Sequence, residues 1–314
     1  MLSIAVHSLS WAMAKKPLVR YLRPSHTSPS TITDALDLAS NFRGLGWDWS
    51  RGLHVPRDTR PTDRMAFVSY TLVSAGVHNV MGGIIYRALN TFIEGVGPRP
   101  TVSTIFDDSL PLPVRYLRAA ALSALACFGI NTNMQMVYDF GAVIGVLVFQ
   151  QDPSQWPPVF DSPWRATSLS EFWGRRWHQS MRHMFIVTAY PLHVLFGRTG
   201  GIIGAFLSSA LTHHLLLLMI NDRTEMWRML VGFGMMAPGM LAERAYYKWT
   251  GKRVGGSVGS VWTMAWLLLW GSVIVDGFAR GGLFFGSSAV DNNSPLRPLV
   301  EKVVVAVDAW LHTI

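Results

Sequence analysis

The sequence predicts an all-helical (all-α) integral membrane protein, a polytopic helical bundle with seven or eight transmembrane helices. Half of its 314 residues are hydrophobic and only 15% are charged, whereas soluble domains carry roughly 25% charged residues. The mean hydropathy of +0.26 agrees with this class. The clearest span is Gly201–Ile220, which contains no Asp, Glu, Lys or Arg. A helix of this length rises about 1.5 Å per residue and therefore crosses a hydrocarbon core about 30 Å thick.

Eight apolar segments follow one another after residue 64. Glycine and proline interrupt several of them, which membrane helices tolerate because neighbouring helices satisfy the freed backbone groups. The segments are Met65–Phe92, Val114–Asn131, Met134–Phe149, Met184–Phe196, Gly201–Ile220, Trp227–Tyr247, Val258–Phe278 and, more weakly, Leu299–Ile314.

Residues 1–64 form a separate N-terminal part, and residues 65–314 make up the membrane-embedded domain. Met1–Ala14 is modestly apolar, too short for a comfortable span and without the basic n-region of a signal peptide, so we expect an interfacial helix or the remnant of a longer helix. The polar, Pro-rich and Arg-rich residues that follow, up to Arg64, are expected to form a cytosolic loop. Within it we expect one short helix over Thr33–Asn41.

The 27 Lys and Arg outnumber the 19 Asp and Glu, but the excess is spread between apolar segments. This pattern fits cytosolic loops and anionic lipid headgroups better than nucleic acid, so we expect membrane lipids and no nucleic acid as partners. The most basic links, Arg57–Arg64, Arg165–Arg182 and Lys248–Arg253, are placed on the cytosolic side. A single cysteine, Cys127, excludes an intrachain disulfide, and no histidine pair combines with carboxylates at metal-ligand spacing, so we predict no metal site.

The longest polar loop within the apolar part is Gln150–Gln179. Four prolines hold its first half extended, and a helix should begin near Ser168 or Ser170, because Glu171 completes a capping-box pattern with Ser168. This helix could be an interfacial anchor or a positively charged binding site for a phosphorylated ligand. It is expected to present Phe172, Arg175, Arg176, Trp177, His178 and Arg182 together.

Two adjacent histidines, His213 and His214, lie well inside the apolar span Gly201–Ile220. An ionisable side chain at membrane depth is costly and usually marks a functional position, although a hydrogen-bonded packing role is the alternative. Ser209 precedes His213 by four residues and shares its helix face, so Ser209 could orient the His213 ring. His214 is rotated by about 100° from His213, so the two rings cannot both face one reacting centre.

Three stretches in this order resemble the wax-synthase-like branch of the membrane-bound O-acyltransferase (MBOAT) family. They are NFRGLGWDW at Asn41–Trp49, SLSEFWGRRWHQ at Ser168–Gln179 and SALTHH at Ser209–His214. The resemblance covers roughly Asn41 to Arg280 and implies an MBOAT-like helical bundle, with residues 65–314 as the acyltransferase domain. Relatives usually carry further N-terminal membrane helices, for which only Met1–Ala14 stands here, so either the fold is shorter or the start was misassigned.

The resemblance implies a catalytic role for two histidines. His213 matches the proposed base of the family, and it is favoured over His214, which stands where many members have a glutamate. His178 matches the second polar residue near the reaction centre. Desolvation in an apolar tunnel favours the neutral imidazole that a general base requires. His178, Trp177 or Gln179 could donate a hydrogen bond to the acyl carbonyl oxygen, and Arg175, Arg176 and Arg182 could bind the phosphates of coenzyme A.

The resulting hypothesis is transfer of an acetyl or other acyl group from acyl-CoA to a hydroxyl of a lipophilic acceptor. The branch includes fungal enzymes that acetylate terpenoids or meroterpenoids in secondary-metabolite biosynthesis, and the compact, Gly-rich chain resembles these more than wax synthases. Acetyl-CoA or another acyl-CoA is the co-substrate, no cofactor is bound, and a multi-pass protein of the endoplasmic reticulum is expected. The alternatives are a long-chain-alcohol O-fatty-acyltransferase, a membrane terpene cyclase, and a small transporter that would use Asp139 and Asp276.

Overall fold

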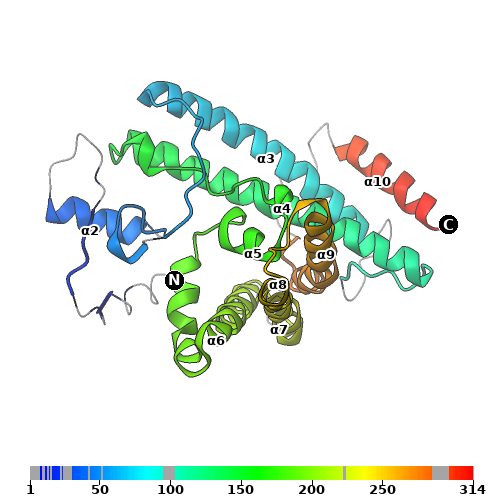
Figure 1. The fold of residues 1–314 in the computed structure, drawn as a ribbon. Coiled ribbons are helices and arrows are strands. Elements are labelled where there is room, and N and C mark those ends of the chain that lie inside the picture. The colour runs from blue at the N-terminus through cyan, green and yellow to red at the C-terminus, as the bar shows by residue number, and fades with distance from the viewer. Residues whose placement is uncertain are drawn as a thin grey trace. The chain divides into compact units, whose positions relative to one another are not determined.

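The computed structural model describes most of the chain, and its described residues form helices joined by turns and longer loops (Figure 1). These residues are 8, 11–12, 14, 16–21, 23, 30–41, 43–50, 52–94, 103–221, 224–284 and 297–313. The principal helices are α2 (Thr31–Ser40), α3 (Arg64–Glu94), α4 (Leu112–Leu147), α5 (Leu169–Glu171), α6 (Arg182–Leu218), α7 (Met226–Gly234), α8 (Met236–Thr250), α9 (Gly256–Arg280) and α10 (Arg297–Leu311).

The chain divides into two compact units. Unit 1 comprises residues 1–70, 142–209 and 239–261, and unit 2 comprises residues 71–141, 210–238 and 262–314. The core of unit 1 contains Phe67, Val68, Ala142, Val143 and Val146, with Trp156 packed against it. Because of their length, α3, α4, α6 and α9 each contribute residues to both units.

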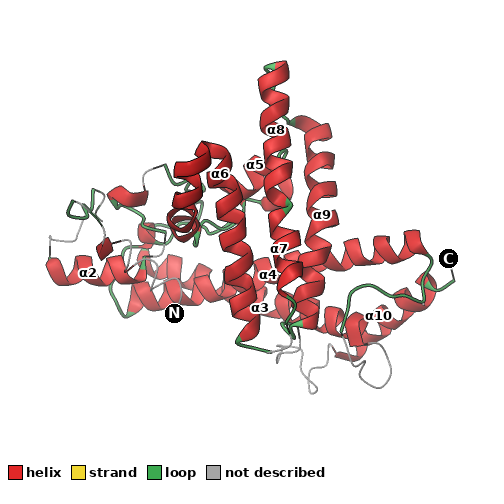
Figure 2. Ribbon diagram, turned by 90° about the horizontal axis from the view of Figure 1, so that it is seen from below, coloured by secondary structure: helices red, strands yellow, loops and turns green. Residues whose placement is uncertain are grey.

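The prediction of an all-helical chain is confirmed over the described residues, where Figure 2 shows helices and loops and no strand. In this part of the chain, three helices are long and apolar enough to cross a membrane. They are Arg64–Ile93, Arg182–Leu218 and Gly256–Arg280. The structure thus supports a membrane helical protein, and the predicted number of seven or eight spans is not confirmed, since three of the described helices meet this criterion.

Two predicted helix boundaries were wrong. The segments expected to end at Asn131 and to begin again at Met134 form one continuous helix, α4. The Thr132 hydroxyl donates to the Gly129 carbonyl at 2.9 Å, so this polar side chain is satisfied within the helix and does not break it. Conversely, the segment Trp227–Tyr247 is divided between α7 and α8. Pro238 accounts for this break, since a proline ring clashes with the carbonyl four residues earlier, at Gly234.

Helix α6 changes direction at Gly197, as the V-shaped path in Figure 1 shows. Gly197 has φ 60° and ψ −147°, a conformation that side chains with a Cβ rarely adopt. After this residue the chain packs back on its first half. A Cβ at Gly204 would lie 2.9 Å from the Cβ of Ala189, and a Cβ at Gly201 would lie 3.1 Å from Nδ1 of His193. Small residues therefore allow the close approach of the two halves, as is common between membrane helices.

The N-terminal part contains the predicted short helix, which is α2 and begins two residues earlier than expected. The predicted segment Met1–Ala14 lies largely outside the described residues. The side chain of Trp47, just after α2, is buried. Its indole N–H donates to Asp37 at 2.7 Å, so Trp47 holds α2 in place.

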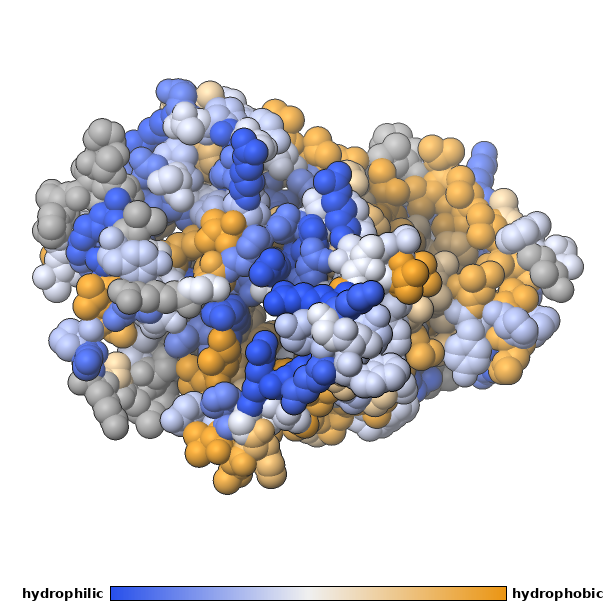
Figure 3. Space-filling view, in the orientation of Figure 1, coloured by the Kyte–Doolittle hydropathy of each residue, from blue (hydrophilic) through white to orange (hydrophobic). Residues whose placement is uncertain are grey.

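Large apolar side chains are exposed along the helices of unit 2. Figure 3 shows apolar residues over α10 and the adjoining part of α4. Leu117, Phe128, Val303 and Trp310 are all exposed on these two helices. A contiguous apolar surface of this kind is expected where acyl chains replace water as the solvent.

Replacing Gly197 with alanine should destabilise the protein by about 1–3 kcal/mol, because the added Cβ strains a backbone that only glycine adopts readily. The cost is conformational, since a Cβ at this position would meet no atom within 4 Å. Thermal unfolding in detergent micelles, followed by tryptophan fluorescence, measures this loss. The control is Gly76→Ala in α3, where the Cβ also meets nothing within 4 Å but the backbone is helical. Equal melting temperatures for both variants would contradict the assigned role of Gly197.

Candidate functional site

The stretch SLSEFWGRRWHQ forms one tight turn in unit 1. Ser168 caps α5 as predicted, since its hydroxyl oxygen accepts the Glu171 N–H at 3.0 Å. The helix then widens into a π-turn over Phe172–Arg176, closed by a hydrogen bond from the Trp177 N–H to the Phe172 carbonyl at 2.8 Å. Turns of this kind often occur at functional sites. The expected single helix was wrong, because the turn ends at Arg176 and Arg182 begins α6.

A buried carboxylate from α8 holds the beginning of this turn. Glu243 accepts hydrogen bonds from the backbone N–H groups of Leu169 at 2.6 Å and Ser170 at 3.0 Å. These N–H groups have no partner within their own helix, and a negative charge at a helix N-terminus is favourable. Glu243 is 7% exposed, so these bonds compensate for its burial. They fix the position of α5 relative to α8.

The turn is closed by a second set of ionic contacts. Arg176 donates to Glu171 at 2.7 Å and to the Asp161 carbonyl at 2.8 Å. Burial raises the pKa of Glu171, but hydrogen bonds from Thr167 and Arg176 outweigh it and hold the pKa below its usual value. Glu171 is therefore ionised at neutral pH. The Glu171 carboxylate accepts from Thr167 rather than from the Ser168 N–H, so only half of the predicted capping box forms.

Aromatic rings surround the turn and attach it to α6. Phe172 stacks on Trp177 with ring centroids 5.4 Å apart, and Trp173 meets Phe206 of α6 edge-on at 5.5 Å. His178 follows the turn and lies with its ring 6.0 Å from that of Phe160, edge to face. Such pairs contribute directional packing beyond simple apolar burial. His178 is thus held at the edge of an aromatic cluster.

The remaining predicted site residues of unit 1 differ in whether their side chains already form hydrogen bonds or ion pairs within the protein. Gln179 is buried, and its side-chain amide donates to the Trp173 carbonyl at 3.1 Å and the Trp177 carbonyl at 2.9 Å, which closes the turn. Arg175 is exposed. Of the predicted arginines, Arg176 is the one whose guanidinium is already bound by a carboxylate among the described residues.

The upstream stretch Asn41–Trp49 packs in the same unit. Arg43 is buried and donates to the Pro157 carbonyl at 2.9 Å, at the beginning of the loop that leads to the turn. Trp49 lies 4.4 Å from the ring of His183, at the beginning of α6. Gly44, with φ +66°, leaves room for the ring of Trp49, which a Cβ would overlap. The first two sequence motifs therefore contact the same loop.

His213 lies in unit 2, between aromatic side chains from two other helices. Its ring stacks on Phe233 of α7 with centroids 4.4 Å apart, and Phe278 of α9 lies 6.0 Å away. The residue is half-buried. His214 is 9% exposed, and its Nδ1 lies 3.4 Å from the Thr224 hydroxyl. The two neighbouring histidines thus have different surroundings, aromatic for His213 and polar for His214.

Helices α7 and α9, which carry these aromatic rings, are held together by an ion pair. Asp276 is fully buried and lies 2.5 Å from Nη1 of Arg228 and 3.0 Å from Nε of Arg280. It also accepts hydrogen bonds from Thr104 at 2.5 Å and from the Ile105 N–H at 3.0 Å. Asp276 thus pairs with two arginines, and this network holds together the helices that carry Phe233 and Phe278.

Glycines allow α7 and α9 to approach closely. A Cβ at Gly232 of α7 would overlap Ile274, and one at Gly277 of α9 would overlap the end of Met229. Both Met229 and Phe233 are buried. Close packing and the ion pair together fix the aromatic rings around His213.

The family profile described as "Membrane bound O-acyl transferase family" matches residues 156–234. This range contains both the turn before His178 and the helix that carries His213. The predicted resemblance to this family is confirmed. No solved structure matches the chain.

Three relatives illustrate the range of proteins to which the chain is similar. The O-Mevalon transferase yanI of Aspergillus niger is 31% identical over 169 residues, which are 52% of this chain and 36% of the relative. The acetyltransferase ple2 of Rhodocybe pseudopiperita is 28% identical over 149 residues, 46% and 35% of the two chains. A protein of Arabidopsis thaliana named for long-chain-alcohol O-fatty-acyltransferase activity is 31% identical over 114 residues, 33% and 32% of the two chains. The chain thus spans about a third of the length of these relatives.

Sequence reasoning missed several residues that shape the two regions of this O-acyltransferase-like segment. Phe233 and Phe278 carry no spacing pattern that distinguishes them from other apolar helix residues. Glu243 did carry a signal, since it is the one acidic residue in the predicted segment Trp227–Tyr247. A lone carboxylate in an apolar segment requires a buried partner, and here the partner is the backbone of α5.

Replacing Glu243 with alanine should cost roughly 1.5–3 kcal/mol of stability, because two backbone N–H groups lose a charged acceptor. Glu243→Gln keeps one acceptor oxygen and should lose less. Thermal unfolding in micelles gives the order wild type, Gln variant, Ala variant. A Gln variant less stable than the Ala variant would argue against the capping role.

Proposed function

We propose that this chain transfers an acyl group from acyl-CoA to a hydroxyl of a lipophilic alcohol. The match of residues 156–234 to the O-acyltransferase family supports this reaction class. The observation on which the proposal rests is the position of His213. Its half-buried ring stacks on Phe233 and lies close to Phe278, and all three residues belong to helices of apolar sequence. An imidazole in such surroundings can accept a proton while the aromatic walls limit the access of water.

In the proposed step His213 removes the proton from the acceptor hydroxyl. The alcohol oxygen attacks the thioester carbonyl carbon, a C–O bond forms, and a tetrahedral oxyanion develops. The C–S bond then breaks, the coenzyme A thiolate leaves, and the imidazolium proton returns to the thiolate. The products are an ester and free coenzyme A, and no covalent enzyme intermediate is needed.

We assign supporting roles to the other predicted residues on the basis of the family resemblance. His178, with Trp177 beside it, is proposed to donate a hydrogen bond to the acyl carbonyl oxygen. Gln179 is proposed to hold the turn rather than the substrate, because its amide donates to two backbone carbonyls. Ser209, four residues before His213 on α6, is proposed to orient the imidazole ring.

The arginines are proposed to bind the phosphates of coenzyme A to different extents. Arg175, which is exposed, and Arg182, at the beginning of α6, are the favoured candidates. Arg176 is the less favourable candidate, because Glu171 already binds its guanidinium. A bidentate guanidinium matches phosphate geometry, which is why arginine suits this role.

For the substrates we propose acetyl transfer to a terpenoid-type alcohol in secondary metabolism, at the endoplasmic reticulum membrane. The acetyltransferase name of the Rhodocybe relative supports the acetyl group. A second candidate is transfer of a long acyl chain to a long-chain alcohol, which the name of the Arabidopsis relative favours. Names that refer to mevalon, acetyl and fatty-acyl transfer occur at similar identity, so the acyl length has to be measured.

The test uses microsomes from a host that expresses the chain, supplied with labelled acetyl-CoA or palmitoyl-CoA and a panel of terpenoid and long-chain alcohols. Replacing His213 with alanine should lower ester formation by about 10²–10⁴-fold, the usual contribution of a positioned general base. His193→Ala is the matched control, because His193 lies exposed on the same helix. It should retain full activity.

The outcomes separate the candidates. Ester from acetyl-CoA alone supports an acetyltransferase, and ester from palmitoyl-CoA alone supports the wax-synthase-type reaction. Full activity in the His213→Ala variant would exclude His213 as the base. No ester from a well-folded protein with any pair of substrates would reject acyl transfer and favour a cyclase or a transporter.

A further inference from the structure

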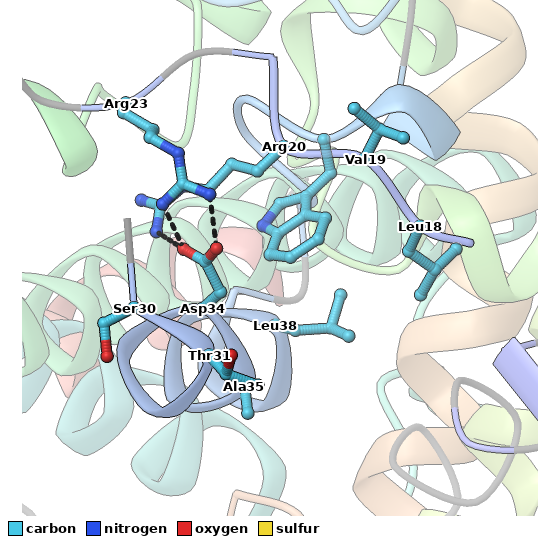
Figure 4. A pocket seen from close by; sticks show the side chains of 10 residues that line it. Leu18, Val19, Arg20, Arg23, Ser30, Thr31, Asp34, Ala35 and Leu38 are labelled. Carbon is cyan, nitrogen blue, oxygen red and sulfur yellow. Dashed lines mark hydrogen bonds and ion pairs between the residues drawn. The ribbon is translucent and has the colours of Figure 1, made fainter. Parts of the chain in front are cut away.

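Helix α2 has its polar and apolar sides reversed relative to a helix on the surface of a soluble protein. Ile32 and Leu36 lie one turn apart and are 73% and 62% exposed. Asp37, on the other side, is 6% exposed. Asp34 points toward Arg20 and Arg23 (Figure 4). The helix therefore presents large apolar side chains outward and turns its carboxylates inward.

Both carboxylates are held by donors of unit 1. Asp34 accepts hydrogen bonds from Arg20 at 3.1 Å and from Arg23 at 2.6 Å. Asp37 accepts from Arg20 at 3.1 Å and from the Trp47 indole at 2.7 Å. The hydrogen bonds from Arg23 lower the pKa of Asp34, against a smaller opposing effect of burial. The charged groups of this region are thus paired with one another and turned away from the outer face of α2.

The extended segment before α2 repeats the same arrangement. The backbone of Arg20 forms an isolated antiparallel β-bridge with Trp47. The Arg20 side chain is 6% exposed and points inward. Its neighbours Val19 and Tyr21 are 53% and 54% exposed. Successive side chains of an extended chain point in opposite directions, so this alternation places arginine inside and apolar residues outside. A pocket of about 530 Å³ lies between this segment and α2 (Figure 4).

Two separate elements thus bury their charges and expose their apolar side chains, which is the arrangement that an apolar solvent selects. In water the opposite arrangement is favoured, because exposed apolar surface costs about 25 cal/mol per Å². Helix α2 has ten residues, about 15 Å at 1.5 Å per residue, so it is too short to cross a bilayer. A short amphipathic helix of this kind lies along the membrane surface.

We propose that Val19, Tyr21, Ile32 and Leu36 form a membrane-docking surface, inserted at the boundary between lipid headgroups and acyl chains. The occupant is the bilayer that the long helices of the same chain already require. Lys16 is exposed three residues before Val19 and supplies a positive charge for anionic headgroups. Tyrosine is enriched at this depth of the membrane. The region around α2 is then a surface element of the membrane rather than a cytosolic loop, and this inference does not depend on the proposed reaction.

The experiment measures the lipid contact of single cysteines in the full-length protein. Cys127 is replaced by alanine, and cysteines at Ile32 or Leu36 are labelled with a bimane fluorophore. The protein is reconstituted in phosphatidylcholine vesicles with and without brominated acyl chains, which quench a fluorophore within the bilayer. Leu269→Cys, 55% exposed on the membrane-length helix α9, is the lipid-facing reference, and Thr59→Cys in the exposed loop before α3 is the water-facing reference.

We expect brominated lipid to quench the labels at Ile32 and Leu36 to a similar extent as at Leu269, and iodide in the aqueous phase to quench them less than at Thr59. Val19→Cys gives an independent third position if either helix variant fails to fold. Quenching by iodide but not by brominated lipid would overturn the proposal. Resistance to both quenchers, together with cross-linking between two copies through position 32, would also overturn it and identify a protein interface.

Discussion

The ion pair between Arg228 and Asp276 holds together the part of unit 2 that contains His213. Asp276 is fully buried, and the loss of its hydration is compensated by two arginines and by donors from the loop at residues 104–105. The pair joins α7 to α9 close to Phe233 and Phe278, whose rings flank His213. A transporter would need a carboxylate that is free to bind and release an ion. Asp276 is instead bound by two arginines and by the loop at residues 104–105, which gives it a structural environment.

The turn before His178 is likewise held by a buried charge, whose lost hydration is compensated by hydrogen bonds. Glu243 lies in an apolar helix, and its cost of burial is compensated by the free N–H groups at the beginning of α5. Arg176 and Glu171 then neutralise each other at the end of the turn. Each charged group is thus satisfied by a partner that also positions a segment of the chain. Each of the two regions is therefore held by buried polar contacts within its own unit, beside the aromatic rings that pack there.

Local patterns in the sequence predicted what depends on local physics. Composition indicated the helical membrane class, and the spacing of Ser168 and Glu171 located the beginning of α5. The π-turn was not predicted, because it depends on contacts such as that of Gln179 with carbonyls of the turn. The aromatic surroundings of His213 were not predicted either. Apolar side chains along a helix do not reveal which ring faces a neighbouring helix, since that is decided by tertiary packing.

A double-mutant cycle at Arg228 and Asp276 tests most directly whether this ion pair maintains the surroundings of His213. Arg228→Gln, Asp276→Asn and the double variant would be compared by thermal unfolding and by ester formation. We predict that each single variant loses stability and activity, and that the double variant loses less than their sum, with a coupling energy of about 0.5–3 kcal/mol. Strictly additive losses, or unchanged ester formation in both single variants, would contradict the account.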